Sequence, residues 1–120
     1  MGSVFGLSFE TKEERERKAK EYANRIFPYG DEQKGKVLDL LCALFPGASR
    51  QQLLLHYILM KEVLAGDGEP DFERAARMTD KKTSIRNTPE TLRLFRALLE
   101  ADLQIDERLE YPTVEELKAN

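Results

Sequence analysis

The sequence predicts an all-α protein, a compact bundle of about five helices around a central, mostly buried third helix at about 49–65. Apolar residues recur at helical spacing, whereas almost no stretch alternates with the period of two that half-buried strands require. Turn signals such as Pro-Gly divide the chain into blocks of helical length. Apolar residues make up 41% of the 120 residues, which indicates one domain with a real core and argues against disorder.

The first helix is predicted to begin after Thr11, whose hydroxyl can cap it while Glu14 closes a capping box. Its first turns, "KEERERK", are wholly charged, and glutamates stand four residues before basic residues, the order that stabilises a helix. An apolar stripe begins only at Ala19 and reaches Ile26. We therefore expect this helix to dock by its C-terminal half, and residues 1–10 to be peripheral or frayed.

The next two blocks are separated by a Pro-Gly turn. Asp31 is predicted to cap the second, amphipathic helix, and Ser49 the third, where Gln52 would complete another capping box. Between Leu53 and Leu64, apolar residues occur on nearly every face of the third helix. A DNA-reading helix needs a polar face for phosphates and base edges. We therefore predict that this helix is the rod of the core, shut off from water on nearly all sides.

Two further helices follow in the C-terminal half. A short fourth helix is predicted over about 70–78. The fifth helix should be capped by Asn87 or Thr88, with Pro89 in the first turn, where its missing N–H does no harm. A stripe of leucines with Phe95 gives this helix a broad apolar face.

The end of the chain carries one more helix signal. Thr113 and Glu116 match a third capping box over a terminal stub, and we expect 112–120 to be peripheral or frayed. No linker or low-complexity tract separates the blocks, so the whole of 1–120 is predicted to be a single helical domain.

Composition and charge narrow the classes of function. The 19 basic and 22 acidic residues give a net charge of −3, which predicts no bulk attraction to nucleic acid or to an anionic membrane. A single Cys42 cannot form an intramolecular disulfide. No apolar run approaches the length of a membrane span, and the N-terminus lacks a signal-peptide pattern. We therefore expect a cytoplasmic protein without a membrane partner.

The sequence contains only weak matches to catalytic and metal-binding motifs. Cys42 and His56 are the only thiol and the only imidazole, and both lie in apolar helical stretches, which favours core packing over a nucleophile and its base. One Cys and one His cannot close a zinc site. A calcium-loop pattern begins at Asp67 but has Phe72 at the glycine position and Met78 in place of the bidentate carboxylate.

Paired carboxylates do not improve the case for an enzyme. They stand at helix starts, where the helix dipole and solvation already explain them. No phosphate-binding glycine loop or nucleophile elbow is present in the sequence. We therefore expect no catalytic residue, no metal and no cofactor, and the balance leans against an enzyme.

The sharpest asymmetry is electrostatic. Residues 72–96 carry seven basic and three acidic side chains, a net charge of +4 in an acidic chain. Two interpretations stay open: a binding site for an anion or an acidic partner, or, as we favour, a solvated loop whose charges only keep it soluble. The candidate site residues are Lys81, Lys82, Ser84, Arg86, Thr88, Arg93 and Arg96.

These observations favour an interaction or regulatory module that binds a partner protein or itself, with a two-fold homodimer as one form. The alternative is a nucleic-acid-binding helical domain that uses the basic region 74–96, for which binding should weaken steeply with salt. An enzyme or a small-ligand carrier, with a pocket between the third and fifth helices, ranks third.

Overall fold

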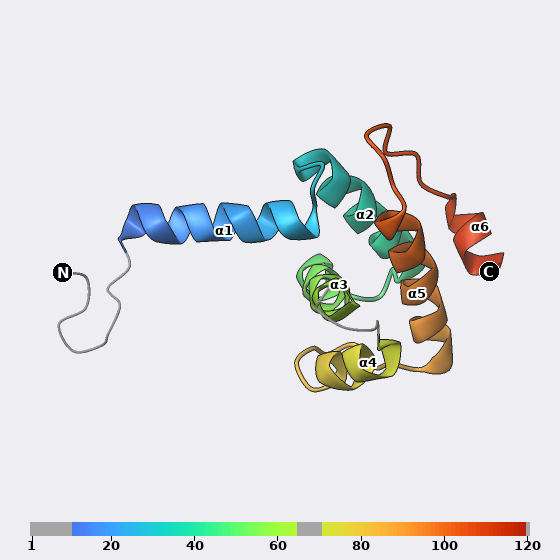
Figure 1. The fold of residues 1–120 in the computed structure, drawn as a ribbon. Helices are drawn as coiled ribbons and strands as arrows, with labels where there is room; N and C mark the ends of the chain where they lie inside the picture. The colour runs from blue at the N-terminus through green and yellow to red at the C-terminus, as the bar shows by residue number, and fades with distance from the viewer. Residues whose placement is uncertain (1–10, 65–70, 120) are drawn as a thin grey trace.

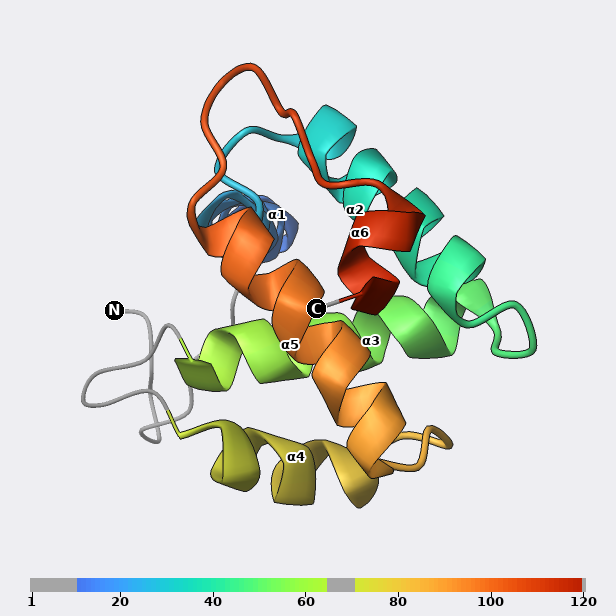
Figure 2. The same ribbon diagram turned by 90° about the vertical axis from the view of Figure 1, so that its right-hand side faces the viewer.

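The computed structural model describes residues 11–64 and 71–119. Within these ranges every regular element is a helix, which confirms the predicted all-α class. Figures 1 and 2 show the bundle in two views related by a quarter turn. The helices are α1 (Lys12–Ile26), α2 (Asp31–Leu44), α3 (Arg50–Leu64), α4 (Phe72–Asp80), α5 (Pro89–Leu103) and α6 (Val114–Ala119).

Helix α3 is the centre of the bundle, as predicted. It packs against α1, α2, α4 and α5, and Leu53, Tyr57 and Met60 on it are fully buried. Its burial is less complete than expected, because Leu54 is only half-buried and Leu55 is 39% exposed. The prediction that α3 is shut off from water on nearly all sides is therefore wrong at Leu54 and Leu55, because each neighbouring helix covers only an arc of α3.

Helix α1 projects from the body of the bundle (Figure 1). Thr11 caps it by accepting a hydrogen bond from the Glu14 amide at 3.0 Å, and Ile26 in its last turn is its one buried residue. The Tyr22 hydroxyl donates to the Glu62 carboxylate at 2.8 Å, which ties the same end to α3. Docking by the C-terminal half is therefore confirmed.

One predicted cap and one predicted capping box differ from the observed structure. Gly30, not Asp31, precedes α2, with a φ of 83° that favours glycine. Asp31 is instead the first helical residue, where its charge suits the helix dipole. Ser49 caps α3 through the Gln52 amide, but the Gln52 side chain accepts from the Ser84 amide, so the second capping box does not close.

Helix α4 begins two residues later than predicted and is capped by Asp71, which accepts from the Arg74 amide. Residue 70 and the start of the calcium-loop pattern, Asp67, lie outside the described residues. Asp71, an acidic residue of the same pattern, therefore serves as a helix cap.

Helix α5 is capped by one of the two residues predicted for this role. Thr88, not Asn87, accepts from the Thr91 amide, and Pro89 occupies the first turn. Asn87 has a different role, since its side chain points inward to the buried His56. Figure 2 shows α5 lying across α3 at the surface of the bundle.

The C-terminal segment is anchored rather than frayed. Thr113 and Glu116 form the predicted capping box in both directions. Leu117 on α6 is fully buried, and α6 packs against α2 and α5. Before it, Leu109 is buried and its carbonyl accepts from the Lys36 ammonium at 3.1 Å. Residues 114–119 thus form a helix at the edge of the bundle, held by one apolar side chain that packs between α2 and α5.

The buried apolar residues form one continuous cluster that draws on all six helices. Phe95 lies near its centre, with ring centroids 5.0 Å from Phe45 and 4.8 Å from His56. Among the described helices, none is long and apolar enough to cross a membrane.

Candidate functional site

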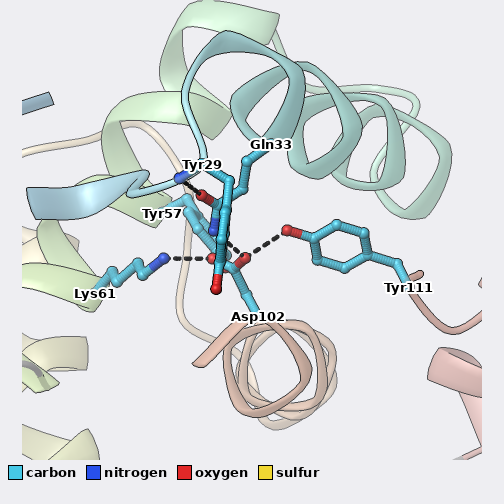
Figure 3. Close-up of polar contacts among 6 residues, drawn as sticks. All are labelled: Tyr29, Gln33, Tyr57, Lys61, Asp102 and Tyr111. Atoms are coloured by element: carbon cyan, nitrogen blue, oxygen red, sulfur yellow. Dashed lines mark hydrogen bonds and ion pairs between the residues drawn. The ribbon is translucent and has the colours of Figure 1, made fainter. Parts of the chain in front are cut away.

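The most heavily hydrogen-bonded group in the core is the carboxylate of Asp102 (Figure 3). One oxygen, Oδ1, accepts from Gln33 Nε2 at 2.9 Å and from the Tyr111 hydroxyl at 2.6 Å. The other, Oδ2, accepts from the Tyr57 hydroxyl at 2.7 Å and from Lys61 Nζ at 2.6 Å. We call these five residues the Asp102 cluster.

Four segments distant in sequence supply the Asp102 cluster. Gln33 comes from the first turn of α2, Tyr57 and Lys61 from adjacent turns of α3, Asp102 from the end of α5, and Tyr111 from the chain before α6. Spacing of four residues puts Tyr57 and Lys61 on one face of α3, so both reach the same carboxylate. The cluster therefore sets how α2, α3, α5 and the C-terminal segment lie relative to one another.

Two further contacts orient the donors. The Gln33 carbonyl oxygen accepts from the Tyr29 amide at 2.9 Å, which leaves the side-chain NH₂ for Asp102. The Lys61 ammonium lies 5.2 Å from the centre of the Phe27 ring, a cation–π contact inside the core. The positions of both donors are thus determined by neighbours outside the cluster.

Burial and hydrogen bonding act in opposite directions on Asp102. The residue is 3% exposed, and burial alone would raise its pKa, but the donors Lys61, Tyr111, Tyr57 and Gln33 together hold that pKa below its ordinary value. Burial and the neighbouring carboxylate raise the pKa of the Tyr57 and Tyr111 hydroxyls. At neutral pH Asp102 is therefore a carboxylate, and the phenols of Tyr57 and Tyr111 keep their protons.

This geometry suits structure better than catalysis. Each Asp102 oxygen accepts two hydrogen bonds, so the carboxylate has little capacity left to accept a substrate proton. Lys61 is 4% exposed and bound to Asp102. No motif in the sequence predicts this cluster. The available signal was one charged residue on the apolar face of each of two helices, Lys61 on α3 and Asp102 on α5. A charged side chain that is buried needs a partner of opposite charge.

The single imidazole forms a second buried polar group. His56 Nδ1 lies 2.7 Å from the Thr83 hydroxyl, and Nε2 lies 2.8 Å from Asn87 Oδ1. The Asn87 NH₂ donates to the Ala76 carbonyl and the Thr79 hydroxyl, so its oxygen faces His56 and Nε2 carries a proton. This arrangement ties the connector between α4 and α5 to α3.

Cys42 and His56 do not form a nucleophile–base pair. Both imidazole nitrogens are engaged by Thr83 and Asn87, and the half-buried Cys42 sulfur lies 3.5 Å from an Arg50 nitrogen. Among the described residues, no group of three or more His, Cys, Asp or Glu side chains is placed to hold a metal ion.

The basic candidate residues fall into separate settings. Lys81, Lys82 and Arg86 are exposed on the connector. The Ser84 amide donates to Gln52, and Thr88 is occupied as the cap of α5. The connector as a whole is not loose, because Thr83, Asn87 and the half-buried Ile85 hold its inner side against the bundle.

The two arginines of α5 already have partners. Arg93 pairs with Glu90 at 2.7 Å and also donates to the Lys118 carbonyl at 2.7 Å. Arg96 pairs with Glu100 at 3.2 Å. The structure therefore does not gather the seven predicted residues around one anion-sized position.

An apolar groove opens between the C-terminal end of α3, the start of α4 and the second half of α5. It has a volume of about 240 Å³ and is lined by Leu64, Phe72, Leu99 and Leu103, with Arg96 and Glu100. Leu99 is buried, whereas Leu103 is 52% exposed. Arg96 lies over the Phe72 ring, 5.1 Å from its centre. We call this the α3–α4–α5 groove.

Fold and sites together define a small all-α bundle with a buried ionic cluster at its core and an apolar groove on its surface. Comparison of the chain with protein-family models, with curated proteins and with solved structures finds no match.

We expect the protein to lose stability on acidification from pH 8 to pH 5. Burial lowers the pKa of His56 below its ordinary value of 6.5, so the unfolded chain takes up a proton before the folded chain does. Stability is full above pH 6.5 and declines as the pH falls toward the folded pKa. Urea unfolding followed by circular dichroism at several pH values measures this decline.

His56 is the only imidazole in the chain, which makes the control simple. In His56→Gln the free energy of unfolding should be lower at pH 8 and nearly constant down to pH 5. A variant with the same pH dependence as the native protein would assign the decline to other groups.

Proposed function

We propose that the protein is a non-catalytic interaction module that binds another protein chain through the α3–α4–α5 groove. The observation that carries the proposal is the half-exposed Leu103 beside Phe72 and Leu64, an apolar surface open to water next to charged side chains. Exposed apolar patches with a polar rim are typical of protein–protein interaction sites.

The surroundings of the groove fit this role. Arg96 and Glu100 flank apolar residues on α5 and can donate and accept hydrogen bonds at the edge of an interface. The groove is formed by the ends of three helices whose relative positions depend on the buried core. A preformed surface of this kind loses little conformational entropy on binding.

A photo-crosslinking amino acid placed at Leu103 tests the proposal in the living cell. We expect covalent adducts to a protein chain from position 103 and none from Glu32, an exposed position at the start of α2. Adding Phe72→Asp should abolish the adducts, because a charge in the apolar groove must be desolvated on binding. Equal yields from positions 103 and 32 would contradict the proposal.

The nucleic-acid alternative receives less support. Two of the basic residues in the region 74–96, Arg93 and Arg96 on α5, are paired with carboxylates. We expect no mobility shift of duplex DNA even at low salt, where phosphate contacts are strongest. A shift that disappears in a Lys81→Glu, Lys82→Glu, Arg86→Glu variant would restore that alternative.

A further inference from the structure

The outer face of α5 carries opposite charges one turn apart beside the groove. The Arg96 and Glu100 side chains are 62% and 65% exposed and pair within the helix at 3.2 Å. Both line the groove together with Leu99 and Leu103. Figure 2 shows α5 at the surface of the bundle.

This charge order is complementary to itself under a two-fold rotation. If two α5 helices lie antiparallel about an axis near the level of residue 98, Arg96 of each copy comes opposite Glu100 of the other. Two-fold dimers use the same patch on both subunits, so one pair of residues forms two intersubunit ion pairs. Four charges of alternating sign then form a network, which stabilises more than an isolated surface pair.

From these observations we infer that the α3–α4–α5 groove, flanked by Arg96 and Glu100, is a two-fold interface for a second copy of this chain. This inference rests on the proposed function and names the partner. The same rotation places Leu103 of each copy opposite the level of residue 93 on the other α5, so the partner helix covers this apolar side chain when the charges pair. Burial of apolar surface supplies the affinity, and the charges determine the orientation.

The dimer is expected to be weak. The six described residues that line the groove are few beside the roughly 20–30 residues that each partner contributes to a stable interface. We therefore expect a dissociation constant in the micromolar range or above, and a monomer–dimer equilibrium that depends on protein concentration. Sedimentation equilibrium of the purified full chain over a wide concentration range measures it.

Charge reversal tests the geometry directly. In Arg96→Glu, the carboxylate introduced at position 96 of each copy would face Glu100 of the other copy, and in Glu100→Arg two arginines would meet in the same way. Each variant alone should dimerise at least about tenfold more weakly than the native chain. An equimolar mixture of the two variants should recover dimers, because every facing pair is then of opposite charge.

Two controls separate this effect from folding. Arg17→Glu removes an equally exposed pair with Glu21 on α1 and should leave the dimer unchanged. Both α5 variants should unfold at nearly the same urea concentration as the native chain, because exposed ion pairs contribute little stability.

Several results would overturn the inference. A native chain that is monomeric at all concentrations contradicts it, and so does a variant mixture that sediments like its separate components. If Leu103 crosslinks to a different protein while the native chain stays monomeric, the proposed function stands and the two-fold interface falls. Crosslinks between copies through Leu103 support both.

Discussion

Asp102→Asn is expected to lower the free energy of unfolding by about 3–5 kcal/mol, the range for breaking a buried ion pair. The substitution leaves the Lys61 ammonium, 4% exposed, without an opposite charge in the core. It also replaces one acceptor oxygen by a donor that faces other donors. Urea unfolding at pH 7, followed by circular dichroism, measures the loss.

Two comparison variants identify the cause of that loss. Asp106→Asn removes a carboxylate only four residues away that pairs with Arg108 on the surface, and should cost clearly less stability than Asp102→Asn. Adding Lys61→Met to Asp102→Asn should recover part of the stability, since no buried charge then remains. Equal losses in Asp102→Asn and Asp106→Asn would show that the Asp102 cluster does not hold the fold together.

Phe95→Ala is expected to cost about 3–5 kcal/mol, the range for removing a buried aromatic ring. Phe95 is fully buried and packs its ring against Phe45 on one side and His56 on the other. Because α2, α3 and α5 meet around it, the cavity cannot collapse without moving one of them. Thermal and urea unfolding of the purified variant measure the change.

The same substitution at Phe72 gives a matched comparison. Phe72 is half-buried at the start of α4 and lines the groove, so Phe72→Ala should cost clearly less stability than Phe95→Ala. It should weaken binding through the groove, which Phe95→Leu should preserve. A larger stability loss at Phe72 than at Phe95 would place the centre of the core elsewhere.

Together these variants separate the two parts of the molecule. The Asp102 cluster and Phe95 hold the helices in position, whereas the groove residues carry the proposed interaction. A substitution in the core that displaces α5 would also move Arg96 and Glu100, although it does not replace them. The binding of each variant is therefore compared with its unfolding curve.

Local features could be predicted from the sequence by itself. Thr11, Ser49, Thr88 and Thr113 all cap helices as expected, because a cap depends on residues only three positions apart. The all-α class followed from apolar periodicity, and the central position of the third helix followed from apolar residues on nearly every one of its faces; both features are local. The docking of the first helix by its C-terminal half followed from the charged run at its start.

Only the tertiary structure decided which polar residues enter the core. Gln33 and Asp102 are 69 positions apart, and nothing local in the sequence brings them together. Nor did periodicity show that Leu55 and Leu103 stay exposed, since a stripe indicates an apolar face but not whether a neighbour covers it. The physical reason is range: capping and periodicity act within a few residues, whereas burial and ion pairing depend on how whole helices pack.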